Sequence, residues 1–237
     1  MIVHLDHPNT QQVRRAAIAL GDLLNEVVFV GGLMIPFFIS DRGLHRMRPT
    51  DDVDVVVECR TRQAYHQFAQ RLQVLGFRPD QSPGAPVCRY RMADGLVLDA
   101  MPLDGEILGF SNRWYPLAMD TAVSVDLSNG IAIRAAHPVA LLATKWEAFF
   151  DRGSDDPFGS HDLEDVLMLV AGRAELAYEL QSLSLDARTF IAESVQKLLG
   201  APWFDDVLEG TFPDAQRLPK VLVGIRERIS GLVSQTS

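Results

Sequence analysis

The sequence predicts an α+β protein with a mixed β-sheet in an N-terminal lobe and helices in a C-terminal lobe. Two observations predict this fold class. Helical and strand patterns alternate through the first half of the chain, whereas helical periodicity dominates the second half. In addition, acidic residues begin or interrupt two apolar runs, 53–57 and 96–101, that otherwise read as buried strands. We therefore expect one lobe over residues 1–135 and another over 136–237.

Composition limits the class of protein. The chain has 237 residues, 47% of them hydrophobic and 22% charged, which is enough for one large core or two modest ones. No apolar run is long enough to span a membrane, so we expect a cytoplasmic protein without a membrane partner. The net charge of −9 disfavours a general nucleic-acid coat but is compatible with a local basic patch. Cys59 and Cys88 lack CxxC partners, which indicates two ordinary buried thiols rather than a structural zinc site.

The N-terminal elements follow from apolar spacing. A helical stripe covers 11–24, and the β-branched run Val27–Val30 predicts a strand that leads into Gly31-Gly32. A short helix is expected over 33–39. Thr61 is a suitable N-cap for a helix that continues to Leu75 and is closed by Gly76.

Residues 87–92 and 96–101 read as a β-hairpin joined through Asp94-Gly95. With a two-residue turn, Asp99 would face Tyr90, and Arg89 and Arg91 would lie on the opposite face. A loop one residue longer would reverse this arrangement, because a shift of one residue moves every side chain to the other face. The sequence leaves both registers open.

The C-terminal lobe reads as a series of helices. Pro138 suits a first helical position, and its helix carries Lys145 and ends before Gly153. Ser160 can cap a second helix, which carries Asp162 and Asp165 and ends near residue 171. Further helical patterns cover 174–183, 186–199 and 218–233, with Gly200 as a C-terminal stop.

Paired carboxylates are the main chemical signal. Side chains alternate faces along a strand, so Asp52 and Asp54 share a face while Val53 points into the core. Such a pair is best stabilised by a divalent cation, and oxygen ligands favour Mg²⁺. Asp99 supplies a third acid in the later strand. Three carboxylates on adjacent strands could hold two metal ions roughly 3.5–4 Å apart for an in-line phosphoryl or nucleotidyl displacement.

The order of these motifs resembles the nucleotidyltransferase superfamily with the polymerase-β-like fold. Its signature is a Gly-Gly or Gly-Ser turn, an acidic pair separated by one residue, and a third acid on another strand. Here those residues are Gly31, Gly32, Asp52, Asp54 and Asp99. The resemblance implies a nucleoside triphosphate substrate cradled by the two glycines. It also implies two Mg²⁺ ions, or Mn²⁺ in their place, bound by the three acids. Asp99 would in addition act as the base for the acceptor hydroxyl or orient that base.

A second set of residues resembles the later motifs of the AbiEii and MenT-type toxin nucleotidyltransferases. Lys145 precedes the segment "SHDLEDV", which contains Asp162 and Asp165. The resemblance implies that these three residues bind the nucleotide, with Lys145 neutralising its charge. It further implies a tRNA 3′ end as acceptor and a cognate antitoxin as partner. A surface lysine and a helix-initiating acid are the plainer interpretations of Lys145 and Asp162.

The loop before the acidic pair is basic. Arg42, His45, Arg46 and Arg48 lie close together in an otherwise acidic protein, and we expect the three arginines to bind a polyanionic acceptor. The acceptor could instead be a small molecule such as an aminoglycoside, or a protein hydroxyl. Two further functions stay open: a non-catalytic nucleotide-binding module with the same fold, and a phosphohydrolase that uses the same acids.

Overall fold

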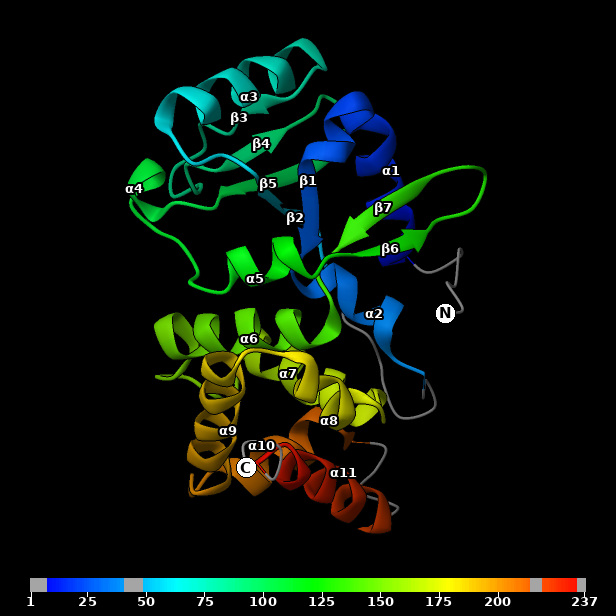
Figure 1. Cartoon of the computed structure of the whole chain (residues 1–237), viewed down its shortest axis with the longest axis vertical. Helices are drawn as coiled ribbons and strands as arrows, with labels where there is room; N and C mark the ends of the chain where they lie inside the picture. The colour runs from blue at the N-terminus through cyan, green and yellow to red at the C-terminus, as the bar shows by residue number, and fades with distance from the viewer. Residues whose placement is uncertain (1–7, 41–48, 214–218, 234–237) are drawn as a thin grey trace. The chain divides into compact units, whose positions relative to one another are not determined.

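The computed structural model describes residues 8–40, 49–213 and 219–233, which form two compact units (Figure 1). The first unit contains residues 8–37 and 49–137, and the second contains 38–40, 138–213 and 219–233. The described β-sheet belongs to the first unit, whereas the regular elements described after Pro138 are helical. The predicted α+β class, with a mixed sheet followed by helices, is confirmed.

The first unit is built on a seven-stranded sheet of order β3-β4-β5-β2-β1-β7-β6 within the described residues. Strand β2 pairs antiparallel with β1 and parallel with β5, and β1 pairs parallel with β7, so the sheet is mixed. The strands are β1 (Val27–Val30), β2 (Asp52–Val57), β3 (Arg78–Pro79), β4 (Arg89–Arg91), β5 (Val97–Pro102), β6 (Val123–Asp126) and β7 (Ala132–Ala135). Valine-rich β1 and β2 lie at its centre.

Helices of 3 to 13 residues connect or precede the strands of this sheet. They are α1 (Pro8–Leu20), η1 (Gly21–Glu26), η2 (Gly32–Met34), α2 (Ile35–Phe38), α3 (Arg62–Val74), α4 (Gly105–Leu108) and α5 (Tyr115–Asp120). The predicted helix 11–24 is wrong at its C-terminal end, because Gly21 has a φ of +52° and the chain continues as a 3₁₀-helix. The predicted N-cap is confirmed: the Thr61 hydroxyl accepts a hydrogen bond from the Ala64 N–H at 3.1 Å.

The hairpin adopts the longer of the two loops left open by the sequence. Met92 N–H donates to Leu96 O at 2.9 Å across a three-residue loop, and Gly95 takes the left-handed conformation with a φ of +86°. Arg89 therefore lies opposite Asp99. The β6–β7 hairpin, whose strands have four residues each, was not predicted from the sequence.

The second unit packs its helices around α6. Its elements are α6 (Pro138–Ala148), the π-helix η3 (Phe149–Gly153), α7 (His161–Gly172), α8 (Leu176–Glu179), η4 (Leu180–Ser182), α9 (Leu185–Leu199), α10 (Phe204–Thr211) and α11 (Pro219–Gly231). The predicted Ser160 cap is confirmed, because its hydroxyl accepts from Leu163 N–H at 3.3 Å. The helix expected over 174–183 is instead two short pieces, α8 and η4.

Helix α6 is apolar on nearly all sides because α7, α8 and α9 all pack on it. Trp146 is 1% exposed and lies within 6.1 Å of Phe149 and Phe150, centroid to centroid.

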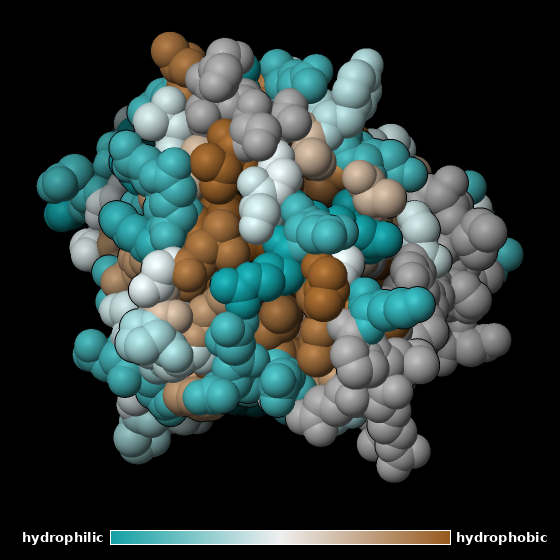
Figure 2. Space-filling model, turned by 90° about the horizontal axis from the view of Figure 1, so that it is seen from below, coloured by the Kyte–Doolittle hydropathy of each residue, from teal (hydrophilic) through white to brown (hydrophobic). Residues whose placement is uncertain are grey.

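Figure 2 shows a face on which hydrophobic side chains form a stripe between hydrophilic ones. No helix in the described part of the chain combines the length and the hydropathy needed to cross a membrane.

Candidate active site

A glycine turn and an aspartate lie in direct contact at the end of β1. The register of β1 and β2 places Val30 opposite Asp54, so Gly31 comes next to that carboxylate. Gly31 has φ +76° and ψ −176°, a conformation essentially restricted to glycine. A Cβ at this position would lie 2.0 Å from Asp54 Oδ2. Both the backbone conformation and the close approach therefore require glycine.

The three predicted acids gather on two neighbouring strands. On β2, Asp52 and Asp54 are partly exposed whereas Val53 and Val55 are buried, as the alternation predicts. The parallel pairing of β2 and β5 places Asp54 opposite Asp99, which is 6% exposed. Residues paired in this way point to the same side of the sheet, so the three carboxylates share one face.

Arg89, which the sequence did not assign to the site, connects two of these acids. Its Nε donates to Asp99 Oδ1 at 2.8 Å, and its Nη2 donates to Asp99 Oδ2 at 2.7 Å and to Asp52 Oδ2 at 2.8 Å. The hydrogen bonds to Asp99, followed by the negative charges of Asp99 and Asp52, raise the pKa of Arg89 above its usual value and outweigh the effect of burial. The register of the β4–β5 hairpin could have revealed this contact. That register depends on whether the loop has two or three residues, which the sequence left open.

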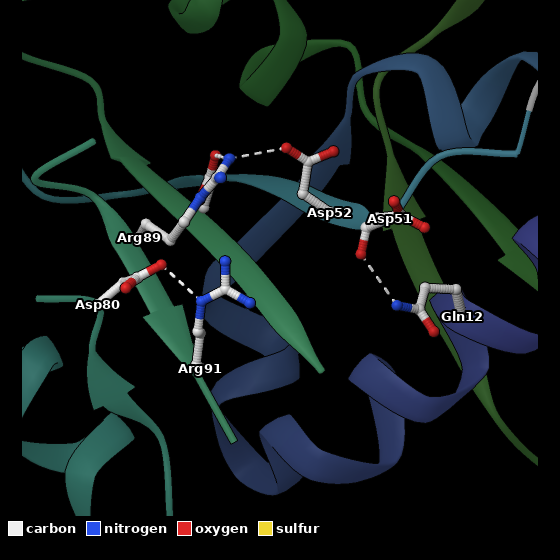
Figure 3. A network of polar contacts seen from close by, with 7 residues as sticks. Gln12, Asp51, Asp52, Asp80, Arg89 and Arg91 are labelled. Carbon is white, nitrogen blue, oxygen red and sulfur yellow. Dashed lines mark hydrogen bonds and ion pairs between the residues drawn. The ribbon is translucent and has the colours of Figure 1, made fainter. Parts of the chain in front are cut away.

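The neighbouring polar side chains have partners of their own (Figure 3). Arg91, two residues after Arg89 on β4, donates from Nε to Asp80 Oδ2 at 2.5 Å. The backbone oxygen of Asp51 accepts a hydrogen bond from Gln12 Nε2 at 3.0 Å, while its side chain is exposed. Arg91 and Asp51 are therefore natural comparison positions for Arg89 and Asp52.

A thiol also lies near the acids. Burial, followed by the charge of Asp99, raises the pKa of Cys88 to about 12. The group is therefore a neutral thiol at neutral pH and lacks the thiolate that a cysteine nucleophile needs. Both cysteines are free and buried, as the sequence predicts.

The other predicted nucleotide-binding residues form a buried ion cluster within the second unit. Lys145, 9% exposed on α6, lies 2.9 Å from Asp162 Oδ1 and 2.6 Å from Asp165 Oδ2 on α7. Arg152 donates from Nε to Asp162 Oδ2 at 2.9 Å. Burial raises the pKa of Asp162, but Lys145 and Arg152 outweigh it, and the pKa falls below its ordinary value. Lys145 is therefore not a surface lysine.

The remaining predictions concern the basic loop, the segment after Gly31 and the metal ligands. Arg42, Arg46 and Arg48, with His45, lie outside the described residues. Gly32 begins the three-residue helix η2, so the helix expected over 33–39 is a 3₁₀ turn followed by the single turn of α2. Within residues 8–40, 49–213 and 219–233, no three His, Cys, Asp or Glu side chains are grouped so that they could hold a metal ion.

Comparisons with known proteins give only distant similarity. No protein-family model matches the chain, and no curated protein matches it in sequence. In structure, the chain is similar to JHP933 from Helicobacter pylori, with a TM-score of 0.47 and 13% identity over 96% of this chain and 92% of that one. It is also similar to a "putative nucleotidyltransferase from H. pylori", with a TM-score of 0.40 and 14% identity over the same shares. At these TM-scores and identities the two similarities do not identify a function for this chain.

Proposed function

We propose that this protein is a magnesium-dependent nucleotidyltransferase, which moves a nucleoside monophosphate from a nucleoside triphosphate to an acceptor hydroxyl. One observation carries the proposal: the Gly31 turn lies against Asp54, and Asp52 and Asp99 share its face of the sheet. This grouping combines a glycine turn, whose backbone a ligand can approach closely, with three carboxylates, which are hard oxygen donors. Both features suit a triphosphate and its cation.

The chemistry of the donor set fits a divalent cation at Asp52 and Asp54. Both carboxylates are partly exposed and lie on the same side of β2, where their mutual repulsion favours a cation. A bound Mg²⁺, or Mn²⁺ in its place, would neutralise the triphosphate and lower the pKa of the acceptor hydroxyl. Gly31 and Gly32 would let the triphosphate approach the backbone closely. No protein nucleophile is needed, since positioning and electrostatics supply most of the catalysis.

The proposed partners follow from the resemblance to the toxin enzymes. The resemblance to the toxin enzymes favours a tRNA 3′ end as acceptor, bound by Arg42, Arg46 and Arg48, and a cognate antitoxin. Lys145, Asp162 and Asp165 remain proposed nucleotide-binding residues, and their mutual ion pairs also give them a structural role in the second unit. A cytoplasmic location would suit all these partners.

The main alternative is a nucleotide-binding module that lacks catalysis, and a small-molecule acceptor is the alternative within the enzyme class. Retention of all three acids on one face favours an enzyme, because a binding module would not need them. Tests with labelled triphosphates and either total RNA or aminoglycosides would separate these functions.

The decisive experiment incubates purified protein with each labelled nucleoside triphosphate, Mg²⁺ and total RNA. We expect labelled RNA with the wild type, none with EDTA, and a loss on the order of 1000-fold in Asp52→Asn and Asp54→Asn, because several kcal/mol of charge stabilisation disappear. Asp51→Asn is the matched control, since its carboxylate is exposed and adjacent, and it should retain activity. Near wild-type turnover in Asp52→Asn or Asp54→Asn would show that the metal assignment is wrong.

A further inference from the structure

The guanidinium of Arg89 occupies the space between two of the predicted metal ligands. Both oxygens of Asp99 accept hydrogen bonds from it, at 2.8 and 2.7 Å, and one oxygen of Asp52 accepts a third at 2.8 Å. A two-ion site would need Asp99 as a ligand. A metal ion at Asp99 would have to displace these hydrogen bonds or lie directly beside the guanidinium, and two cations that close repel each other.

We infer that Arg89 is a fixed cation in place of a second metal ion, so that the chain binds one divalent cation, at Asp52 and Asp54. This inference rests on the proposed function. Asp99 then becomes a positioning residue that holds Arg89, and the guanidinium supplies permanent positive charge for the phosphate oxygens of the substrate.

The strand register makes this contact persistent. Arg89 and Asp99 are directly opposite each other on β4 and β5, and the three-residue loop that ends at Gly95 sets that register. The Asp99 side chain is 9% exposed and the Arg89 side chain 22%. Removing the guanidinium would leave a buried carboxylate without its cation, which is a costly state.

Arg91 shows that the arrangement is specific to one position. It lies two residues along the same strand, is more exposed, with 48% of its side chain accessible, and pairs with Asp80 rather than with the acids of the site (Figure 3). It is a matched control, because it has the same side chain on the same strand.

The test counts bound Mn²⁺ by the electron paramagnetic resonance signal of the free ion, with Mn²⁺ alone as the probe. We expect one ion per chain for the wild type and for Arg91→Met. We also expect one ion, with a dissociation constant within about threefold of wild type, for the double variant Arg89→Met with Asp99→Asn, which removes one positive and one negative charge. Circular dichroism checks that each variant is folded.

The outcomes separate this inference from the function it rests on. Two ions in the wild type would overturn it, because Arg89 would then give way to metal. Loss of the ion in a folded double variant would also overturn it, because Asp99 would be a ligand. No bound ion in the wild type would remove the metal site itself, and with it the proposed function. If the double variant does not fold, the wild-type count alone decides.

Discussion

The protein contains two clusters in which one cation bridges two aspartates, and they differ in charge and exposure. In the first unit, Arg89 joins Asp52 and Asp99, and the Asp52 side chain is 35% exposed. In the second unit, Lys145 joins Asp162 and Asp165, and all three side chains are at most 11% exposed. Arg152 adds a second positive charge to Asp162. The helical cluster is thus neutral once Arg152, whose side chain is 69% exposed, is counted, whereas Arg89, Asp52 and Asp99 together have one more negative than positive charge.

The difference bears on where an added cation would be stabilised. A mostly buried ion cluster mainly fixes the packing of the helices that carry it, here α6 and α7. A partly exposed set with an excess of carboxylates gains from a cation supplied from outside. By this criterion the acids beside Gly31 are the better candidate for a cation site, and the Lys145 cluster has a structural role.

The largest effect is expected from removing the cation of the closed cluster. Lys145→Met should lower the free energy of unfolding by about 3–5 kcal/mol, because it leaves two buried carboxylates with less compensation. Urea denaturation followed by circular dichroism measures this change. Lys220→Met is the control on an exposed lysine and should stay within about 0.5 kcal/mol. Equal effects of the two substitutions would contradict the structural role of Lys145.

A second loss of stability is expected from filling the space beside Asp54 at the open cluster. Gly31→Ala should cost about 1–3 kcal/mol in backbone strain and more from the clash with Asp54 Oδ2, 2.0 Å from the new Cβ. Gly130→Ala is matched, with a φ of +75° and no atom within 4 Å of its Cβ, and it adds strain alone. In thermal unfolding, the melting temperature of Gly31→Ala should be clearly lower than that of Gly130→Ala. Gly31→Ala should also bind Mn²⁺ more weakly than Gly130→Ala. If it binds Mn²⁺ more tightly, Gly31 is not part of the metal site.

The smallest effect concerns acid stability. The native pKa of Asp162 lies below its ordinary value of 3.8, because Lys145 and Arg152 outweigh the effect of burial. The stabilisation that follows is present above about pH 4 and is lost as the pH falls through the native pKa. Asp162→Asn should therefore flatten the fall of the unfolding free energy below about pH 4. Urea titrations across that range measure the slope, and an unchanged slope would show that another group carries it.

Local patterns in the sequence were sufficient for much of the site. The alternation of Asp52 and Asp54 with buried valines depends only on the two-residue period of a strand. The Thr61 and Ser160 caps depend on hydroxyls placed just before an apolar period. The Gly31 turn was also visible, because glycine pairs between a strand and a helix indicate close backbone approach. These features involve residues near one another in the chain.

Only the tertiary structure decided how the charges are paired. Arg89 meets Asp99 because the hairpin loop has three residues rather than two, and a change of one residue would have turned both arginines away. Lys145 is buried because α7 packs on α6 and brings Asp162 and Asp165 to it. Asp162 lies 17 residues after Lys145 in the chain. Sequence patterns report which face a residue occupies within its own element. The partner across that face depends on register and helix packing, which are set by contacts between distant parts of the chain.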